Sequence, residues 1–210
     1  MSLAGAGGPQ VVPRWGPSSS PRDRIVAAAC ELFNSGGVQA TTVDAIMAAA
    51  GVARNTFYRY FPSKELLVLA FLERADAEWR SWFTAAVEQF APSPATRLLG
   101  VFEVVVPWFL SPTFRGSPIA NVAAEAGDRD DRVAELAAAH RRFVHTFLAG
   151  LATQGRLRRP AELASELQIL LDGAVVGAQS QTGATARRAV AAHAARAAAA
   201  VIGHHTPPGE

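Results

Sequence analysis

The segment from Thr41 to Leu67, TTVDAIMAAAGVARNTFYRYFPSKELL, constrains the fold more than any other part of this 210-residue chain. Apolar residues at helical spacing predict a helix that begins at Thr42, whose hydroxyl can cap exposed backbone N–H groups. Gly51 then permits a turn, because glycine adopts backbone conformations that other residues avoid. Beyond the turn, Val52 and Phe57 can anchor a second, shorter helix. The segment therefore predicts two helices joined by a tight break.

The rest of the chain has the same helical periodicity. Apolar residues recur at three- and four-residue intervals without strict alternation, which predicts an all-α fold of about nine helices. Pro107 should kink or terminate the helix in which it lies, because proline lacks the backbone N–H that a helix interior needs. The expected helices cover about 22–35, the two helices of 41–67, 63–90, 94–110, a short helix from 117, 130–153, 161–179 and 185–202.

The outer face of the short helix after Gly51 has the side chains of a DNA-reading surface. A helix in the major groove reads bases near its amino end and is flanked by groups that hold phosphates. Arg54 can offer two donors to a guanine edge and Asn55 can pair with adenine, whereas Thr56 and Tyr58 suit backbone oxygens or a thymine methyl. A solvated or merely packed face is the alternative interpretation of such residues taken singly.

A longer stretch, ATTVDAIMAAAGVARNTFYRYFPSKELL, resembles the DNA-binding signature of TetR-family transcriptional regulators. The resemblance extends back through IVAAACELFNSGG, and so covers Arg22 to about Glu73. Ala53 stands where the family often has serine, so one helix-capping hydroxyl is missing. By motif position, the resemblance implies DNA contacts by Thr42, Arg54, Asn55, Thr56, Tyr58, Tyr60 and Lys64, with Arg59 as an addition.

The resemblance implies an N-terminal three-helix helix-turn-helix DNA-binding domain followed by a C-terminal helical ligand-binding and dimerisation domain. We expect a disordered N-terminal arm, rich in Gly, Pro and Ser, at 1–20, the DNA-binding domain at 21–66, the C-terminal domain at 67–203 and a flexible tail at 204–210. Lys64 should begin the helix that links the domains, where its ammonium and free backbone N–H groups could hold a phosphate.

Double-stranded DNA, a small-molecule effector and a second copy of the chain are the implied partners. The homodimer would form through the helices at 161–179 and 185–202, where Gly173 and Gly177 give a weak signal of close helix approach. The expected activity is that of a repressor that releases a palindromic operator when a largely apolar or aromatic effector binds.

Aromatic residues of the C-terminal half are candidate walls for the effector, with ordinary core packing as the alternative for each. Polar groups within apolar stripes add three further candidates, because a pocket orients its ligand with a few hydrogen bonds. At Asp172, a cap or an interhelical hydrogen bond is the favoured interpretation. The candidates are Trp79, Trp82, Phe83, Phe102, Trp108, Phe109, Phe143 and Phe147, together with the polar residues Asn121, Glu125 and His140.

The sequence leaves two other functions to compare with this one. An all-α enzyme using His140, His145 and Glu125 is disfavoured, because histidines five residues apart face different sides of a helix and no nucleophile motif accompanies them. The second is a DNA-binding regulator without an effector, whose C-terminal domain only dimerises or binds a partner. It fits the sequence better than an enzyme does.

Composition sets limits of its own. No apolar run approaches the roughly 20 residues that cross a bilayer, and the N-terminus lacks the core of a secretory signal, so we expect a cytoplasmic protein without a membrane segment. The only cysteine, Cys30, excludes an internal disulfide and is expected to be a small buried thiol. No cofactor or metal site is expected from the spacing. The net charge of +2 and isoelectric point near 9.2 permit a basic patch.

Overall fold

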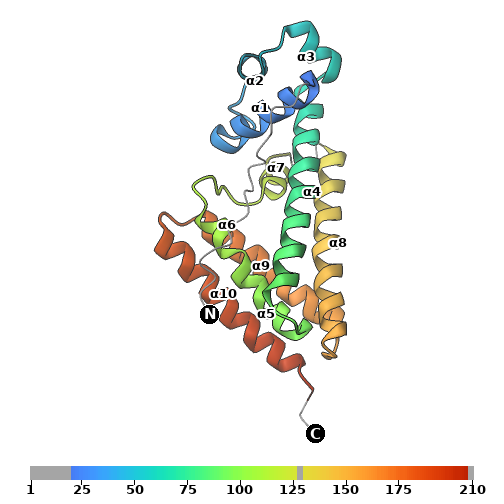
Figure 1. The fold of residues 1–210 in the computed structure, drawn as a ribbon, viewed down its shortest axis with the longest axis vertical. Helices are drawn as coiled ribbons and strands as arrows, with labels where there is room; N and C mark the ends of the chain where they lie inside the picture. Colours follow the sequence, from blue (N-terminus) through green and yellow to red (C-terminus); the bar gives the residue numbers. More distant parts are fainter. Residues whose placement is uncertain (1–19, 127–129, 208–210) are drawn as a thin grey trace. The chain divides into compact units, whose positions relative to one another are not determined.

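The computed structural model describes residues 20–126 and 130–207. Within these ranges the chain forms ten α-helices and no β-strand, so the predicted all-α fold is confirmed (Figure 1). The predicted N-terminal arm lies outside the described residues apart from Ser20, as do the last three residues of the predicted tail. The helices are α1 (Pro21–Gly36), α2 (Val43–Ala50), α3 (Arg54–Tyr60), α4 (Lys64–Phe90), α5 (Pro94–Val104), α6 (Val106–Leu110), α7 (Pro118–Ala126), α8 (Asp131–Gln154), α9 (Pro160–Gln179) and α10 (Ala184–His205).

The segment after Pro94 forms two helices where the periodicity suggested one. The first, α5, ends at Val104, and the five-residue α6 begins at Val106 with Pro107 in its first turn. Proline tolerates the first turn of a helix but not the interior, where its ring meets the carbonyl four residues earlier. The predicted effect of Pro107 is therefore confirmed, and it accounts for the additional helix. Each of the described helices is too short or too polar to span a lipid bilayer.

The chain divides into two compact units. The N-terminal unit holds the described residues up to Trp79 together with Pro118–Ala137, and the C-terminal unit holds Arg80–Ser117 and the chain from Ala138 onwards. Both α4 and α8 contribute residues to each unit.

The core of the N-terminal unit gathers apolar side chains from α1, α2, α3, the first half of α4, α7 and the start of α8. Ile25 of α1, Ile46 of α2 and Phe57 of α3 are fully buried in it. Phe33 of α1 meets Phe71 of α4 edge-on, with ring centroids 5.3 Å apart. Burial of each such side chain contributes about 1.5–3 kcal/mol. Together they hold α1, α2 and α3 against the first half of α4.

The C-terminal unit is built around the antiparallel pair α9 and α10, with α5 and α6 packed against it (Figure 1). Gly177 of α9 faces Val190 of α10, where an added Cβ would lie 3.1 Å from a valine methyl carbon. A side chain at Gly177 would therefore push the two helices apart. Gly173, by contrast, faces open space.

Charged groups also join elements of the C-terminal unit. Arg141 of α8 forms a short ion pair with Asp172 of α9, which confirms the interhelical bond predicted for this aspartate. Arg187 of α10 donates a hydrogen bond to the backbone oxygen of Phe109 at 2.9 Å and lies over the ring of Phe114. The final helix, α10, continues to His205, three residues beyond the expected end at 202, and the ring of His205 is buried.

Cys30 lies in the core of the N-terminal unit, with its side chain 1% exposed, as predicted. Burial, reinforced by the negative charge of Glu78, raises the pKa of the thiol from 9.0 to about 12. The thiolate is the reactive form of cysteine, so the folded protein should react negligibly with a thiol-specific disulfide reagent at about pH 8. The denatured chain should react with one equivalent. Rapid labelling of the folded protein would contradict the burial of this thiol.

Candidate nucleic-acid interface

The first helix of the motif is fixed at both ends. The Thr42 hydroxyl accepts a hydrogen bond from the backbone N–H of Ala45 at 3.1 Å, which confirms the predicted cap. At the other end, Gly51 has φ 61° and ψ 44°, a left-handed conformation that favours glycine. Arg24 of α1 donates to the backbone oxygen of Ala50 at 3.2 Å and so ties α2 to α1. These contacts set where the chain turns toward α3.

The short helix α3 is anchored by one side chain. Phe57 is fully buried, and its ring meets that of Tyr58 edge-on at 5.2 Å. Ala53 precedes the helix and supplies no side-chain cap, as expected from its residue type. The position of α3 therefore depends on the burial of Phe57 more than on local hydrogen bonding.

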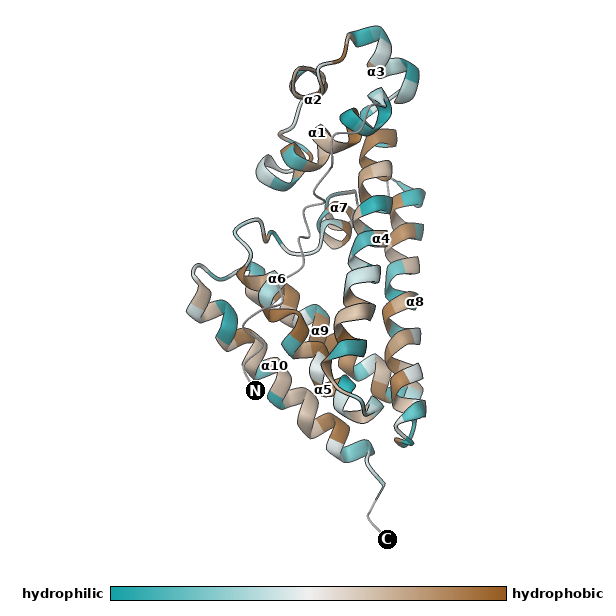
Figure 2. Cartoon of the chain, in the orientation of Figure 1, coloured by the Kyte–Doolittle hydropathy of each residue, from teal (hydrophilic) through white to brown (hydrophobic). Residues whose placement is uncertain are grey.

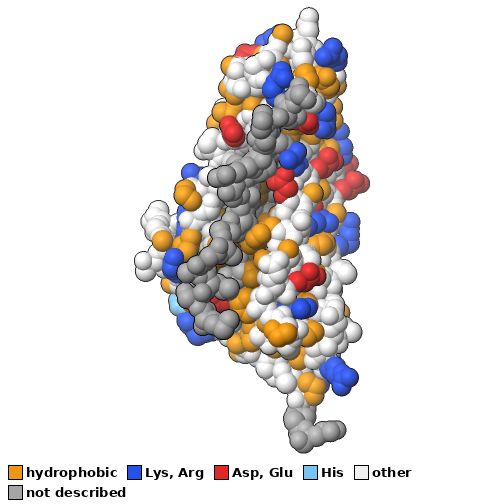
Figure 3. Space-filling view, viewed as in Figure 1, with side chains coloured by type: hydrophobic (Ala, Val, Ile, Leu, Met, Phe, Trp, Pro, Cys, Tyr) orange, Lys and Arg blue, Asp and Glu red, His pale blue; other side chains and the backbone are white. Residues whose placement is uncertain are grey.

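The opposite side of α3 is open to solvent. Arg54, Asn55 and Arg59 are exposed, Tyr58 is 41% exposed, and Thr56 and Tyr60 are half-buried. Figure 2 shows hydrophilic residues along α3, in contrast to the hydrophobic residues that follow Lys64 and Glu65 in α4. Figure 3 shows Lys and Arg side chains on the surface of the α1–α3 region in that view. The polar side chains singled out from sequence thus share one short helix, and most of them face solvent.

Arg54 is held by two neighbours. Its guanidinium donates to the carboxylate of Asp44 in α2 at 2.9 Å and lies 5.9 Å from the centre of the Tyr58 ring. Both members of the ion pair are largely exposed, so the pair contributes about 0–1 kcal/mol and is easily exchanged for another partner. The sequence alone does not indicate this role for Asp44, because a carboxylate in the first turn of a helix is also an ordinary stabilising residue.

The start of α4 lies beside this surface within the same unit. Lys64 is the first residue of the helix, and its ammonium donates to the backbone oxygen of Gln39 at 3.5 Å. The Ser63 hydroxyl accepts a hydrogen bond from the N–H of Leu66 at 3.3 Å. A hydrogen bond with the same serine side chain, followed by one with its own backbone N–H, lowers the pKa of Glu65. Lys64 therefore lies at a helix end where the N–H groups of Glu65 and Leu66 already have side-chain partners.

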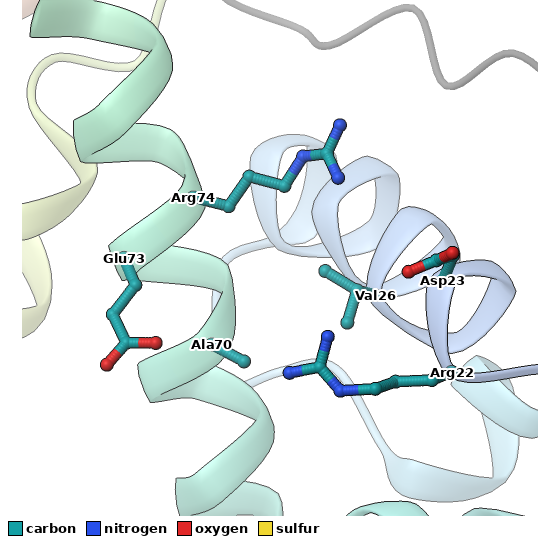
Figure 4. Close-up of a pocket in the computed structure, with 6 residues that line it drawn as sticks. All are labelled: Arg22, Asp23, Val26, Ala70, Glu73 and Arg74. Atoms are coloured by element: carbon teal, nitrogen blue, oxygen red, sulfur yellow. The ribbon is translucent and has the colours of Figure 1, made fainter.

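A hollow of 280 Å³ lies between α1 and α4 in the N-terminal unit. In Figure 4, Arg22 extends from α1 and Arg74 from α4 around the space lined by Val26 and Ala70, while Glu73 extends from the other side of α4. Arg22 also lies over the Phe61 ring at 5.4 Å, and Arg74 pairs with Glu78 at 2.8 Å. Because four of its six lining residues are charged, this hollow does not match the apolar effector pocket expected from sequence.

The candidate effector residues fall into both units. Trp79, Asn121 and Glu125 belong to the N-terminal unit, where Glu125 is exposed, and the others belong to the C-terminal unit. In the C-terminal unit Phe143 stacks on Phe147 and lies under Arg80, whose guanidinium carbon is 4.7 Å from the ring centre. Four candidates of the C-terminal unit are buried: Phe83, Phe102, Trp108 and Phe109. Four are half-buried: Trp82, His140, Phe143 and Phe147.

Known proteins share both the motif and the fold. The family described as "Bacterial regulatory proteins, tetR family" matches residues 25–71. An HTH-type transcriptional regulator of Mycobacterium tuberculosis (strain ATCC 25618 / H37Rv) is 30% identical over 165 residues, which are 75% of this chain and 81% of that protein. The HTH-type transcriptional repressor KstR2 of Mycolicibacterium smegmatis is 32% identical over 87 residues, or 40% of each chain.

A solved structure agrees with these relatives. The crystal structure of a TetR-family transcriptional regulator from Streptomyces coelicolor superimposes with a TM-score of 0.78 at 26% identity, and the match covers 89% of this chain and 96% of that one. The fold and the helix-turn-helix define a DNA-binding transcriptional regulator, not an enzyme. The chain belongs to the TetR family.

Proposed function

We propose that this regulator is a repressor that binds a palindromic operator as a homodimer, inserting α3 of each copy into the major groove. The main support for the proposal is that α3 has one buried face and one exposed polar face. Phe57 fixes the helix from within, while Arg54, Asn55 and Tyr58 point into solvent. A base-reading helix needs this combination of a rigid inner face and an unobstructed polar outer face. The relative KstR2, itself named a repressor, supports the direction of regulation.

In this proposal the DNA-contacting side chains have two roles. Arg54 and Asn55, at the amino end of α3, meet base edges. The remaining contacts, to phosphates and sugars, come from the hydroxyls of the motif, from Arg59 and from Lys64 at the start of α4. The full set is Thr42, Arg54, Asn55, Thr56, Tyr58, Arg59, Tyr60 and Lys64.

Arg54→Ala and Lys64→Ala should therefore weaken DNA binding in different ways. Loss of a bidentate guanine contact is expected to cost about 1–3 kcal/mol on the operator and little on unrelated duplexes. Loss of a phosphate contact should weaken binding to all duplexes alike. It should also reduce the slope of log affinity against log salt concentration by about one, because one fewer counterion is released on binding. Fluorescence anisotropy on operator and scrambled duplexes, over a range of salt concentrations, separates the two. Arg142→Ala, which removes an exposed arginine of α8, is the control.

The chain offers a second test, because Lys64 is its only lysine. Acetylation by an amine-selective reagent can therefore be followed at this one side chain by mass spectrometry. Operator DNA should protect Lys64 from the reagent, while the amino terminus serves as an internal reference. Equal losses from Arg54→Ala and Lys64→Ala on every duplex, or an unprotected Lys64, would argue against the proposed roles.

The proposed dimer joins α9 and α10 of each copy in a four-helix arrangement. Ile169 and Val176 of α9 are 65% and 59% exposed although both are large and apolar. They are seven residues apart, so they share one face of the helix with the open side of Gly173. Exposed apolar side chains in register on one helix are typical of an association surface.

The proposed effector acts from the C-terminal half. Trp82, His140, Phe143 and Phe147 are half-buried and so can be reached without opening the core. Rings supply contact area for an apolar or aromatic molecule, and His140 supplies a polar group that orients it. Binding would then shift the protein toward a state in which the two α3 helices no longer match successive grooves. Only a difference in affinity between the two states produces such a shift.

A library of small aromatic and apolar compounds tests this part of the proposal. A true effector should raise the thermal midpoint and lower operator affinity, by about 5- to 150-fold for a coupling of roughly 1–3 kcal/mol. Phe143→Ala should abolish both effects and leave operator binding without compound unchanged. If compounds that bind never alter operator affinity, the C-terminal domain serves dimerisation or partner binding instead.

A further inference from the structure

We propose that Glu162, Glu166 and His205 form a binding site for one divalent transition-metal ion, such as Zn²⁺, that joins the start of α9 to the end of α10. One potential ligand atom from each of the three side chains lies within 4.8 Å of the others. All three residues belong to the C-terminal unit, and none has a role in the proposed DNA contacts. The site is therefore separate from the proposed DNA-reading surface, although it lies on the two helices of the proposed dimer.

The main support for this site is the burial of the His205 ring and the contacts of its two nitrogens. Its side chain is 1% exposed, and Nδ1 lies 2.7 Å from the backbone oxygen of Arg158. A carbonyl oxygen only accepts, so Nδ1 must hold the proton in this contact. A ring that carries only this proton has its lone pair at Nε2, and Nε2 lies 3.0 Å from a carboxylate oxygen of Glu166. Two acceptors would then meet beside a carboxylate that is 42% exposed, and a metal ion bound between them would turn this contact into an attractive one.

The loop before α9 holds the ring in this orientation. The backbone N–H of Arg158 donates to the backbone oxygen of His205 at 2.8 Å, and its guanidinium donates to the backbone oxygen of His204 at 2.7 Å. Arg156 and Arg159, on either side, have φ angles of 54° and 49°, which are uncommon for residues other than glycine. A histidine that ligates a metal usually donates its other N–H to a carbonyl or carboxylate, as His205 does here.

The two glutamates complete the ligand set. Glu162 and Glu166 are four residues apart on α9, so both carboxylates lie on one face of the helix. Ligands of one tetrahedral Zn²⁺ ion, each about 2.0–2.2 Å from it, are roughly 3.3 Å apart, close to the observed spacing of His205 and Glu166. A nitrogen with two carboxylate oxygens favours Zn²⁺ and neighbouring transition metals over Ca²⁺, which prefers oxygen alone.

Arg159 is the competing cation. It donates to both oxygens of Glu162 at 3.0 Å, but the side chains are 58% and 49% exposed. An exposed pair of this kind contributes about 0–1 kcal/mol, so a divalent ion can displace the guanidinium. Water would supply the fourth position, on the exposed side of the glutamates.

Titration of the metal-free full-length protein with Zn²⁺, and with Co²⁺ as a spectroscopic probe, tests the proposal. We expect one ion per chain, the visible absorption of tetrahedral Co²⁺, and a thermal midpoint that rises with Zn²⁺ concentration. Glu162→Gln and Glu166→Gln keep the size of partly exposed side chains and should each weaken binding by about tenfold or more. His204→Gln, the exposed neighbouring histidine, and Glu88→Gln, an exposed glutamate of α4, should bind as the unaltered protein does.

Three results would overturn the proposal. Without any Zn²⁺ or Co²⁺ binding, the cation at Nε2 is a second ring proton, and the contact is a histidinium–glutamate ion pair. Equal weakening by His204→Gln would indicate adventitious binding by surface histidines. Unchanged affinity in both glutamine variants would place the ion elsewhere.

Discussion

Phe57→Ala is expected to destabilise the protein by about 3–5 kcal/mol and to abolish operator binding at physiological salt. Phe57 is fully buried and is the only fully buried side chain of the seven-residue α3, so its removal leaves a cavity that so short a helix cannot fill. Denaturant unfolding of the full chain, followed by the loss of helical circular dichroism, measures the change. The loss of DNA binding follows because the outer face of α3 is positioned through this ring.

Tyr58→Ala is the matched control, since it removes a neighbouring ring of similar size from the exposed face. We expect it to cost less than about 1 kcal/mol of stability while still weakening DNA binding. Equal destabilisation by the two changes would mean that α3 is not anchored through Phe57.

Replacing both Ile169 and Val176 with lysine should convert the protein to a monomer and lower its affinity for a palindromic duplex by about 10²–10⁴-fold. The loss is large because two linked half-site contacts bind far more tightly than either alone. Four added charges per dimer on one apolar surface would repel each other and lose the burial that joins the copies. Size-exclusion chromatography with light scattering gives the oligomeric state, and anisotropy gives the affinity.

Thr146→Lys combined with Thr153→Lys is the matched control. Both threonines are exposed on α8 and have the same seven-residue spacing, so the variant adds the same charge to a different helix. It should behave as the unaltered protein in both measurements. If the Ile169 and Val176 variant stayed dimeric, α9 would not form the interface.

Much of the fold could be predicted from sequence because its signals are local. The Thr42 cap and the left-handed Gly51 depend on residue type at a chain turn, and both are present as predicted. Pro107 likewise acts within one helical turn, although the periodicity could not show whether it kinks or divides the helix. The buried Cys30 followed from its place beside an apolar stripe.

The contacts that sequence analysis missed join residues far apart in the chain. Asp44 meets Arg54 only because Gly51 turns α3 back toward α2. His205 was assigned to a flexible tail, because two histidines beside Thr-Pro-Pro have no local signal of burial. Its ring is instead held by Arg158 and Glu166, which lie 47 and 39 residues earlier. Such pairings depend on how α9 and α10 pack, and no spacing rule expresses that.

Selection of bound duplexes from a random pool by the full-length protein tests the central claim most directly. We predict enrichment of a two-fold symmetric sequence, and loss of preference at one symmetric pair of positions when Arg54→Ala is used in the same selection. Two results would contradict the assignment of α3 as the helix that reads DNA. One is no enrichment even at low salt, and the other is enrichment of the same sequence by the unaltered protein and by the Arg54→Ala variant.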